Sequence, residues 1–467
     1  MSATRRIDAL VAEIGSTTTV VSAFDGLLGW PRSRPLTLGQ GTAPTSVAAG
    51  DVTLGLLAAR AQLEAATGPL APDLVLATSS AAGGLRMTVH GLTMRMTAAA
   101  AHEAALGAGA VVKLVTAGRL RDADLRQIDS LAPNLLLLAG GVDGGDVETV
   151  LYNAGRLAEL CSRPLVVYGG NSSVADEVRE LLLQAGFAIR VTTNVYPAVD
   201  ELDIVPARTV IHDAFEEHII HAPGMERIRE IVAGGILPTP GAALISAEAL
   251  AAEIGDLVVI DVGGATTDVH SVTEGSAELA ALQTEPQPHA KRTVEGDLGT
   301  FVSAEHVAAM LPPAARPRRL PPALPASDEE ITAALALARH AAVTAVTRHA
   351  GRLVSLYTST GRTTVVRGRD LTACRWVIGT GGALTRLPGG REILTETLAR
   401  DGGEHLLPPR DATCLLDDDY ILAACGALLA HFPAGAVVAL LRASLGMDEL
   451  DQNARVQDSL DSRRPQQ

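Results

Sequence analysis

The chain has 467 residues, a formal net charge of −15 at pH 7 and 47% hydrophobic residues. This length allows two or three domains, each with its own core, and a cleft between domains is therefore a reasonable expectation. The acidic balance argues against a nucleic-acid partner or an anionic membrane surface, because the chain has only two lysines, Lys113 and Lys291. We expect small molecules or proteins as partners.

The sequence also bears on location and redox chemistry. Its apolar runs, such as residues 135–138 and 420–432, fall well short of the roughly 20 residues that a membrane span needs. The apolar part of the N-terminal segment is too short for a secretory signal, so we expect a cytoplasmic protein. The scattered cysteines form no C-x-x-C pair, which favours reduced packing residues over a disulfide, zinc or iron-sulfur site. These cysteines are Cys161, Cys374, Cys414 and Cys425.

The first domain is expected to span residues 1–72. Residues 7–24 predict a hairpin, within which "VAEIGSTTTVV" (residues 11–21) reads as a strand, a turn of small residues and a second strand. Such a turn offers backbone N–H groups and hydroxyls to a phosphate. Glu13 precedes the turn, at a position where phosphate turns usually carry Asp. Residues 26–44 predict turns and short strands.

Residues 73–205 predict an inserted parallel α/β domain, because apolar strand-like runs alternate with helical segments. The expected strands are 74–77, 110–115, 135–139, 165–168 and 188–191, and the expected helices are 98–106 and 174–185.

Several of these strands end in glycine-rich loops. The loops are residues 79–84, 140–146 and 169–173. In open α/β sheets the carboxyl ends of the strands are where ligands or partners bind. Glycine is also simply what a tight turn needs, so the role of these loops stays open.

Residues 206–450 are expected to form a helix-rich link, over residues 206–231, followed by a second domain. Within it the proline-rich segment 311–327 cannot hold regular structure, because proline removes a hydrogen-bond donor and fixes φ. We interpret this segment as an exposed loop or linker and not as a site. The polar tail, residues 451–467, is predicted to be disordered.

The second domain repeats the device of the first. In "VVIDVGGATTDVHSV" (residues 258–272) Asp261 takes the place of Glu13, and a Gly-Gly-Ala-Thr turn follows it. Two copies with matched acids are hard to explain as ordinary hairpins, and two facing turns would close on a triphosphate. The predicted phosphate-binding residues are Gly15, Ser16, Thr17, Thr18, Gly263, Gly264, Ala265 and Thr266.

An acid beside each turn would face the anion, which makes sense only with a cation between them. Mg²⁺ fits, because it is commonly held by one or two carboxylates together with phosphate oxygens and water. Glu13 and Asp261 are therefore the predicted metal ligands, and water can absorb the extra methylene of Glu13.

A third segment supports a nucleotide site. "WVIGTGGAL" (residues 376–384) reads as a strand followed by G-x-G-G, which permits close approach of the backbone to a flat group such as adenosine. Gly379, Gly381 and Gly382 are the predicted cofactor-binding residues here.

The order of these motifs resembles the actin/Hsp70/sugar-kinase superfamily of ATPases. The resemblance implies a two-lobed α/β fold with an inserted parallel α/β domain, and ATP and Mg²⁺ as cofactors. Its two connecting helices are matched by residues 238–251 and 418–432, the second with Asp418 or Asp419 as a cap and a face of small residues that would allow a close helix crossing.

Five further segments resemble the MutL/GlmL family, the accessory proteins associated with adenosylcobalamin-dependent glutamate mutase and related aminomutases, which are unrelated to the mismatch-repair protein of similar name. The resemblance implies an ATP-using reactivase or chaperone for a carbon-skeleton mutase, with mutase subunits as partners and at most slow ATP turnover. The inserted domain is the candidate partner surface. The segments are residues 78–92, 135–154, 236–244, 261–272 and 291–300.

One departure from the superfamily bears on hydrolysis. The first connecting helix of chaperone-type relatives begins with an acid or amide that positions water, and here that position is Thr239. Glu295 or Asp297 could substitute, so the predicted catalytic residues are Asp261, Glu295 and Asp297. Asp268 is expected to be structural.

Three other classes remain open. The first is an ATP-dependent hydrolase of the hydantoinase/oxoprolinase type, or a kinase, although no Asp base can be assigned. The second is a scaffold that binds nucleotide without turnover. The third, an iron-sulfur activator of radical dehydratases, is disfavoured by the scattered cysteines.

Overall fold

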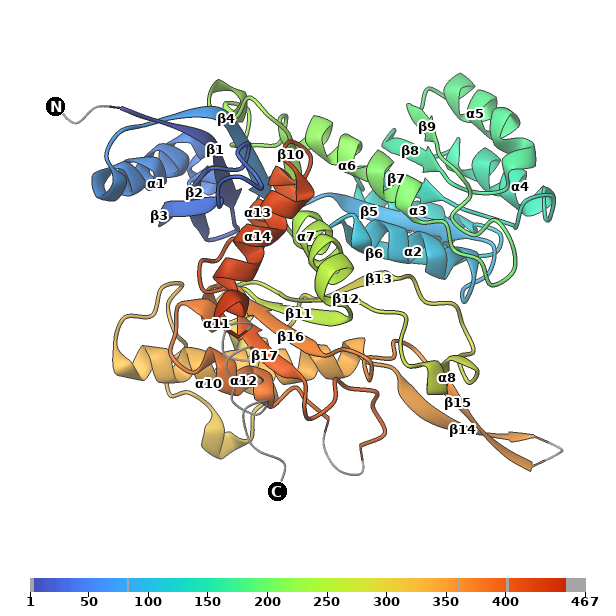
Figure 1. Ribbon diagram of the computed structural model, residues 1–467. Coiled ribbons are helices and arrows are strands. Elements are labelled where there is room, and N and C mark those ends of the chain that lie inside the picture. Colours follow the sequence, from blue (N-terminus) through green and yellow to red (C-terminus); the bar gives the residue numbers. More distant parts are fainter. Residues whose placement is uncertain (1–3, 82–83, 359–360, 400–402, 451–467) are drawn as a thin grey trace.

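The computed structural model describes residues 4–81, 84–358, 361–399 and 403–450, and the predicted tail lies outside them. Within this part, the chain forms two stacked lobes, each built on its own sheet, and a third domain beside them (Figure 1).

The sheet of the first lobe has five strands. They are β1 (Arg5–Ile14), β2 (Thr18–Asp25), β3 (Leu36–Pro44), β4 (Leu70–Ser79) and β10 (Ile236–Pro238). The order is β10-β4-β1-β2-β3, in which β1, β2 and β3 pair antiparallel whereas β4 and β10 join in parallel. Strand β1 is almost entirely buried after its first residues, which explains why it reads as a continuous apolar run.

The sheet of the second lobe repeats this plan. Its strands are β11 (Leu257–Val262), β12 (Thr267–Val272), β13 (Ala290–Glu295), β16 (Trp376–Thr380) and β17 (Thr413–Leu416). The order β13-β12-β11-β16-β17 again combines an antiparallel meander with two parallel strands. The same order and the same strand directions in both lobes confirm the predicted actin/Hsp70-like duplication.

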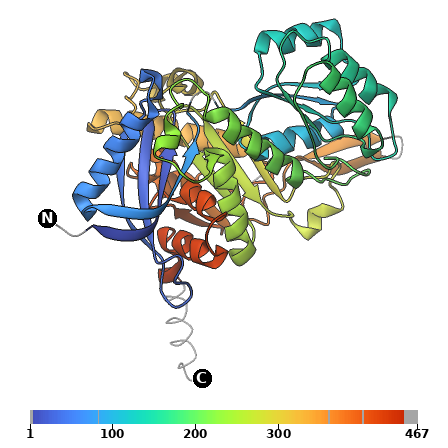
Figure 2. The same ribbon diagram turned by 90° about the horizontal axis from the view of Figure 1, so that it is seen from above.

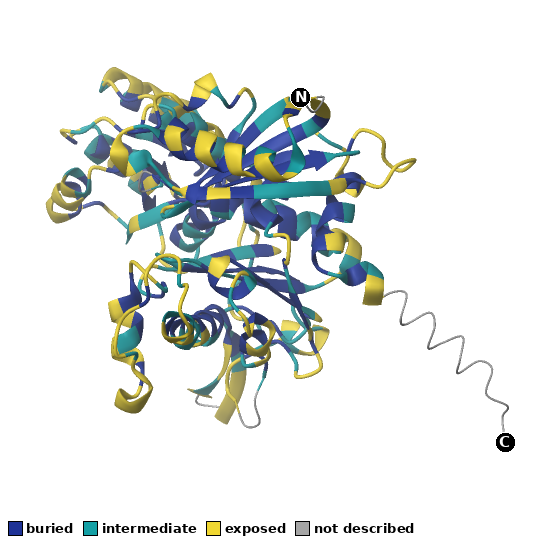
Figure 3. Cartoon of the chain, turned by 90° about the vertical axis from the view of Figure 1, so that its left-hand side faces the viewer, coloured by how far each residue is buried: buried dark blue, intermediate teal, exposed yellow. Residues whose placement is uncertain are grey.

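The helices of the lobes cover these sheets and expose one side to solvent, whereas the strands are mostly buried (Figure 3). They are α1 (Val52–Thr67), α7 (Thr239–Ile254), α8 (Ala277–Ala280), α9 (Ala304–Met310), α10 (Asp328–His349), α11 (Gly382–Thr385), α12 (Gly390–Thr395), α13 (Leu422–Leu428) and α14 (Ala434–Ser444).

The inserted domain is a parallel doubly wound sheet, as predicted. Its strands are β5 (Arg86–Gly91), β6 (Val111–Ala117), β7 (Leu135–Leu138), β8 (Leu165–Tyr168) and β9 (Ile189–Val191), and its helices are α2 (Thr97–Gly107), α3 (Asp122–Leu131), α4 (Glu148–Leu157) and α5 (Ala175–Gln184). The strand order is β6-β5-β7-β8-β9. Figures 1 and 2 show this domain projecting to one side of the lobes, with α6 (Val205–Ile219) as the return link.

Two predicted domain boundaries are wrong. Strand β4, which contains the predicted strand 74–77, pairs in parallel with β1 over residues Arg5 to Ile14, so it belongs to the first lobe and the insertion begins after Ser79. Strand β10 pairs with β4, so the segment 206–450 contributes to both lobes. Local periodicity identifies a buried strand, but it does not say which sheet the strand joins.

The central strand of the inserted domain, β5, was missed from the sequence because it carries buried polar side chains. Thr88 Oγ1 lies 2.9 Å from His90 Nε2, and His90 Nδ1 lies 2.8 Å from Thr116 Oγ1. The three groups satisfy one another inside the sheet, and burial lowers the pKa of His90 to about 4, which keeps the ring neutral.

The two connecting helices cross closely between the lobes, as the face of small residues predicts. A Cβ added at Gly426 in α13 would lie 2.0 Å from the carbonyl oxygen of Ala242 in α7. Only glycine allows this approach. Both lobes therefore share a tightly packed helix pair.

The predicted cap of α13 is wrong. The carboxylate of Asp417, rather than that of Asp418 or Asp419, accepts hydrogen bonds from the backbone N–H groups of Ile421 and Leu422, at 3.1 and 2.9 Å. Asp417 is buried at the end of β17, where these donors and the Ser444 hydroxyl satisfy it.

Strands β14 (Arg352–Thr358) and β15 (Gly361–Arg367) form a two-stranded arm that leaves the second lobe on the side of the inserted domain (Figures 1 and 2). None of the described helices is long and apolar enough to cross a membrane. Cys374, Cys414 and Cys425 are buried and Cys161 is exposed, all without a disulfide, in agreement with the expected packing role of most of them.

Candidate functional site

The two predicted phosphate turns have the same backbone structure. The Gly15 N–H donates to the Thr18 carbonyl at 2.9 Å, and the Gly263 N–H donates to the Thr266 carbonyl at the same distance. A Cβ added at Gly15 would lie 2.7 Å from the Thr18 carbonyl oxygen, so this turn closes only around glycine. The repeat seen in the sequence is thus a repeat in three dimensions.

The turns approach each other across the space between the lobes. A Cβ added at Gly264 would lie 3.7 Å from Cγ2 of Thr17. Both turns line one cavity of about 310 Å³, a volume in the range of ligand pockets. The predicted cofactor-binding residues in its wall are Gly15, Ser16, Thr17, Thr18, Gly263, Gly264, Ala265, Thr266, Gly381 and Gly382.

The glycines of the third motif divide into two roles. Gly381 and Gly382 line the cavity, and Gly381 has φ +87° with the Asp261 carboxylate beside it. Gly379 is not in the lining. It lies within β16, where an added Cβ would meet Leu394 and Leu416, so this glycine serves packing.

Glu13 lies in the wall of the cavity as a buried acid. The Tyr420 hydroxyl donates to its Oε1 at 2.6 Å. Burial raises the pKa of Glu13 to about 7, the hydrogen bond from Tyr420 opposes the rise, and the charge of Asp417 adds to it. The carboxylate is therefore held in place but poorly compensated.

Asp261 lines the same cavity from the second lobe. Burial raises the pKa of its carboxyl group well above the usual range, and the charges of Asp268, Glu13 and Asp417 raise it further. In the described part of the chain, no group of three or more His, Cys, Asp and Glu side chains is arranged to hold a metal ion alone. Two crowded carboxylates fit a Mg²⁺ ion that takes its remaining ligands from phosphate and water.

Asp268 is tied up in the structure. Arg292 Nε donates to its Oδ1 at 2.7 Å, and the Thr266 hydroxyl donates to its Oδ2 at 3.1 Å. All of its strong contacts are thus structural, as expected. His270, two residues along β12, is fully buried with a pKa lowered by burial to about 4, which suits its expected packing role.

Thr239 begins α7 and lines the cavity, flanked by two prolines. Its hydroxyl lies 3.3 Å from Thr78 Oγ1. The position where relatives are expected to carry a water-positioning acid or amide thus carries a hydroxyl that already has a partner within the wall.

The structure does not bring Glu295 and Asp297 to the cavity. Neither residue is in its lining, and both carboxylates accept hydrogen bonds from Arg348 on α10, at 2.6 and 2.8 Å. Arg348 holds the pKa of Asp297 below its usual range. The geometry therefore gives no support to these two residues as substitutes for the missing water-positioning group.

Replacing Glu295 with Gln and Asp297 with Asn should leave nucleotide affinity and any ATP turnover unchanged, because both side chains point to Arg348. The loss of this half-exposed ion-pair cluster should lower the melting temperature by a few degrees at most. Titration calorimetry and thermal unfolding of the double variant measure both effects. A large fall in turnover without a change in melting temperature would return these acids to the catalytic role.

Several wall residues were not expected from the sequence. Arg386 and Leu387 follow the third motif directly, and their proximity to it was the available signal. Tyr420 gave no signal, because it approaches Glu13 from 407 positions away in the chain. The interpretation of residues 311–327 as a linker without a site is wrong in part, because residues 322–325 line the cavity. Proline excluded regular structure there but not a defined position.

Comparisons with known proteins agree with the sequence patterns. A family model described as MutL protein matches residues 9–445. Protein MutL of Clostridium tetanomorphum is 39% identical over 391 residues, which cover 78% of this chain and 84% of that protein.

Among solved structures, nucleotide-free acetone carboxylase has 14% identity and a TM-score of 0.34, over 90% of this chain and 70% of that chain. A glycerol dehydratase reactivase has 11% identity and a TM-score of 0.27, over 90% and 99%. The fold assignment rests on the matching strand orders of the two sheets and not on these distant likenesses. The family model and the identity to the clostridial protein show that the chain belongs to the MutL protein family.

Proposed function

We propose that this protein is an ATP-dependent accessory and reactivating protein for an adenosylcobalamin-dependent carbon-skeleton mutase, such as glutamate mutase or a related aminomutase. The observation that carries the ATP site is the pair of matched turns, each preceded by an acid, around one cavity. The mutase as partner rests on the resemblance of the segments described above to the MutL/GlmL accessory proteins.

In this proposal the phosphates lie between the two turns. The backbone N–H groups and hydroxyls of Ser16, Thr17 and Thr266 bind phosphate oxygens, and the glycines admit the close approach. Glu13 and Asp261 hold Mg²⁺, which neutralises charge between the phosphates and the two acids. Tyr420 keeps Glu13 oriented toward the cavity.

Hydrolysis is expected to be slow. A fast ATPase needs a group that positions the attacking water, within hydrogen-bond reach of it. Thr239 occupies that place, and Asp268 on the facing wall is held by Arg292. A slow turnover suits a protein whose nucleotide state serves as a timer for binding and release.

The cavity is connected to the inserted domain by buried polar contacts. Arg292, which binds Asp268 beside the second turn, also donates to the backbone carbonyl oxygens of Leu106 and Ala110, at 2.9 and 3.3 Å. These carbonyls lie at the end of α2 and just before β6. A change at the second turn therefore has a direct route to the proposed partner surface.

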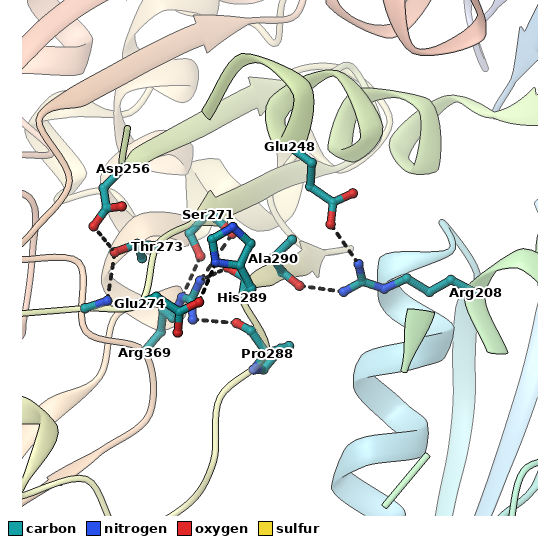
Figure 4. A network of polar contacts seen from close by, with 11 residues as sticks. Arg208, Glu248, Asp256, Ser271, Thr273, Glu274, Pro288, His289, Ala290 and Arg369 are labelled. Carbon is teal, nitrogen blue, oxygen red and sulfur yellow. Dashed lines mark hydrogen bonds and ion pairs between the residues drawn. The ribbon is translucent and has the colours of Figure 1, made fainter. Parts of the chain in front are cut away.

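Further contacts join the same parts. Lys291 Nζ donates to Glu103 of α2 at 2.6 Å. Figure 4 shows Arg208 of the linking helix α6 between Glu248 of α7 and the carbonyl of Ala290 on β13. Burial lowers the pKa of Arg208, and Glu248 opposes this. A partner that binds one nucleotide state better than the other can use these links, because a ligand shifts a conformational equilibrium by its difference in affinity.

The kinase and hydrolase alternatives lack a base. A second cavity of about 690 Å³ adjoins the first and shares Ser16, Thr266 and Asp268 with it. The charged side chains in its lining are Asp268 and Arg292, which pair with each other. A small acceptor molecule bound there would meet no free carboxylate from the lining residues, which is the group that phosphoryl transfer to a hydroxyl requires.

The test is an ATP-hydrolysis assay with and without an adenosylcobalamin-dependent aminomutase, together with the recovery of mutase activity after inactivation. We expect the mutase to stimulate turnover and ATP to restore mutase activity. The variant Asp261→Asn should lose both effects, whereas the exposed Asp411→Asn serves as a control with both retained. Stimulation by small amides or sugars in place of the mutase would contradict the proposal.

A non-catalytic scaffold is the second candidate, and Thr239 is the observation that favours it. Such a protein would bind ATP and the mutase but release the nucleotide unchanged. Single-turnover measurements with labelled ATP separate the two functions, because a scaffold forms no ADP even with the mutase in excess.

A further inference from the structure

Residues 322–325, a Pro-Ala-Leu-Pro segment that we name the strap, form part of the cavity wall. They precede α10, whose Ala334 lines the same cavity. Helix α10 packs against α11, which contributes Gly382 and Ala383 to the wall. The strap therefore lies toward the α11 side of the cavity.

The strap is held in place although it contains no helix or strand. The carboxylate of Glu330 accepts hydrogen bonds from the backbone N–H groups of Ala326 and Ser327, both at 3.0 Å, and the Ser327 hydroxyl accepts one from the Glu330 N–H. This capping box joins the end of the strap to α10. The prolines at positions 322 and 325 restrict the backbone further.

Leu324 lines the cavity but has 61% of its surface exposed. A leucine held in this way presents apolar surface that a ligand can cover. The neighbouring wall residues Ala334, Ala383 and Leu387 are also apolar. Arg386 is the polar exception, and its Nη2 donates to Gln40 Oε1 at 2.6 Å.

The cavity thus has two ends of different character. The turns and the acids Glu13 and Asp261 suit phosphates and a metal ion, whereas the strap and the α11 side suit a flat apolar group. We infer that the strap is one wall of a nucleobase site, in which Leu324 covers a face of the purine of a bound nucleotide. This inference rests on the proposed nucleotide binding.

The same lining sets the specificity. A base is told apart from another by hydrogen bonds to its edge, and loss of such a bond costs a site far more than loss of apolar contact. Only Arg386 offers a side-chain hydrogen-bonding group among the wall residues on this side, and Gln40 already engages it. The protein therefore binds adenine and guanine nucleotides with similar affinity.

The test compares Leu324→Ser with the matched control Leu320→Ser. Leu320 lies in the same proline-rich segment and is 40% exposed, but it is not in the cavity wall. Titration calorimetry with ATP, GTP and inorganic tripolyphosphate, each with Mg²⁺, measures the affinities of the full chain. Leu324→Ser should weaken ATP and GTP about five- to tenfold and leave tripolyphosphate unchanged. Leu320→Ser should change none of them.

The outcomes separate the inference from the proposed function. Equal weakening of ATP and tripolyphosphate by Leu324→Ser, or no weakening of ATP, overturns the strap as a base site while nucleotide binding stands. A preference of more than about a hundredfold for ATP over GTP overturns the inferred specificity. A wild-type chain that binds neither ATP nor tripolyphosphate overturns the proposed function and the inference together.

Discussion

Replacing Gly381 with alanine should abolish nucleotide binding and destabilise the second lobe. Gly381 has φ +87°, a conformation that L-residues rarely adopt, and an added Cβ would lie 2.4 Å from Asp261 Oδ1 and 2.5 Å from the Val262 carbonyl oxygen. The methyl group has to displace either the metal-binding acid or the backbone of β11. Backbone strain and overpacking together should cost about 2 to 5 kcal/mol.

The neighbouring glycine provides the control. An added Cβ at Gly382 meets no atom within 4 Å, so Gly382→Ala should fold with wild-type stability although it lines the same cavity. Urea unfolding and ATP titration of the two variants measure the difference. Wild-type affinity and stability in Gly381→Ala would show that the close approach of the third motif to Asp261 does not exist in solution.

Replacing Arg292 with alanine should produce the largest loss of stability predicted here. Arg292 is buried against the buried carboxylate of Asp268, and it also satisfies two backbone carbonyl oxygens at the inserted domain. Its removal leaves an unpaired buried charge. Breaking a buried pair in this way costs about 3 to 5 kcal/mol.

The consequence extends beyond stability, because Arg292 joins the second turn to the inserted domain. In the wild-type protein we expect ATP to change the hydrogen exchange of α2 and β6. In Arg292→Lys, which keeps the charge but loses the forked donor set, this response should be weakened while the fold is retained. The exposed pair of Arg375 with Asp411 provides a control, since Arg375→Ala should alter neither property.

Two results would contradict this account. A loss of less than about 1 kcal/mol in Arg292→Ala would show that the pair is open to water. An unchanged response of α2 to ATP in Arg292→Lys would show that the nucleotide signal reaches the inserted domain by another route, such as Lys291 and Glu103.

The sequence alone was sufficient for the parts of the site that consist of short, contiguous segments. The two strand-turn-strand motifs, the third glycine motif and the connecting helices are local structures, and their glycines and acids are needed where they stand. Repetition made these patterns specific, because a second copy with a matched acid is far rarer than one Gly-Ser-Thr turn.

Predictions from local pattern were wrong where a residue's role depends on a distant partner. Strand β4 reads as part of the inserted domain until its pairing with β1 is known. Strand β5 looks polar because Thr88 and His90 are satisfied only inside the sheet. Glu295 and Asp297 looked available for catalysis, but Arg348 from α10 engages both.

The sequence by itself determined the duplicated ATPase plan, the phosphate turns and the acids beside them, since each is specified by residues adjacent in the chain. Only the tertiary structure decided that Tyr420 supports Glu13, that Arg292 occupies Asp268, and that the proline-rich strap forms a wall of the cavity. These contacts join segments tens to hundreds of residues apart. Burial and long-range packing create them, and no local pattern of side chains encodes which distant segment will arrive.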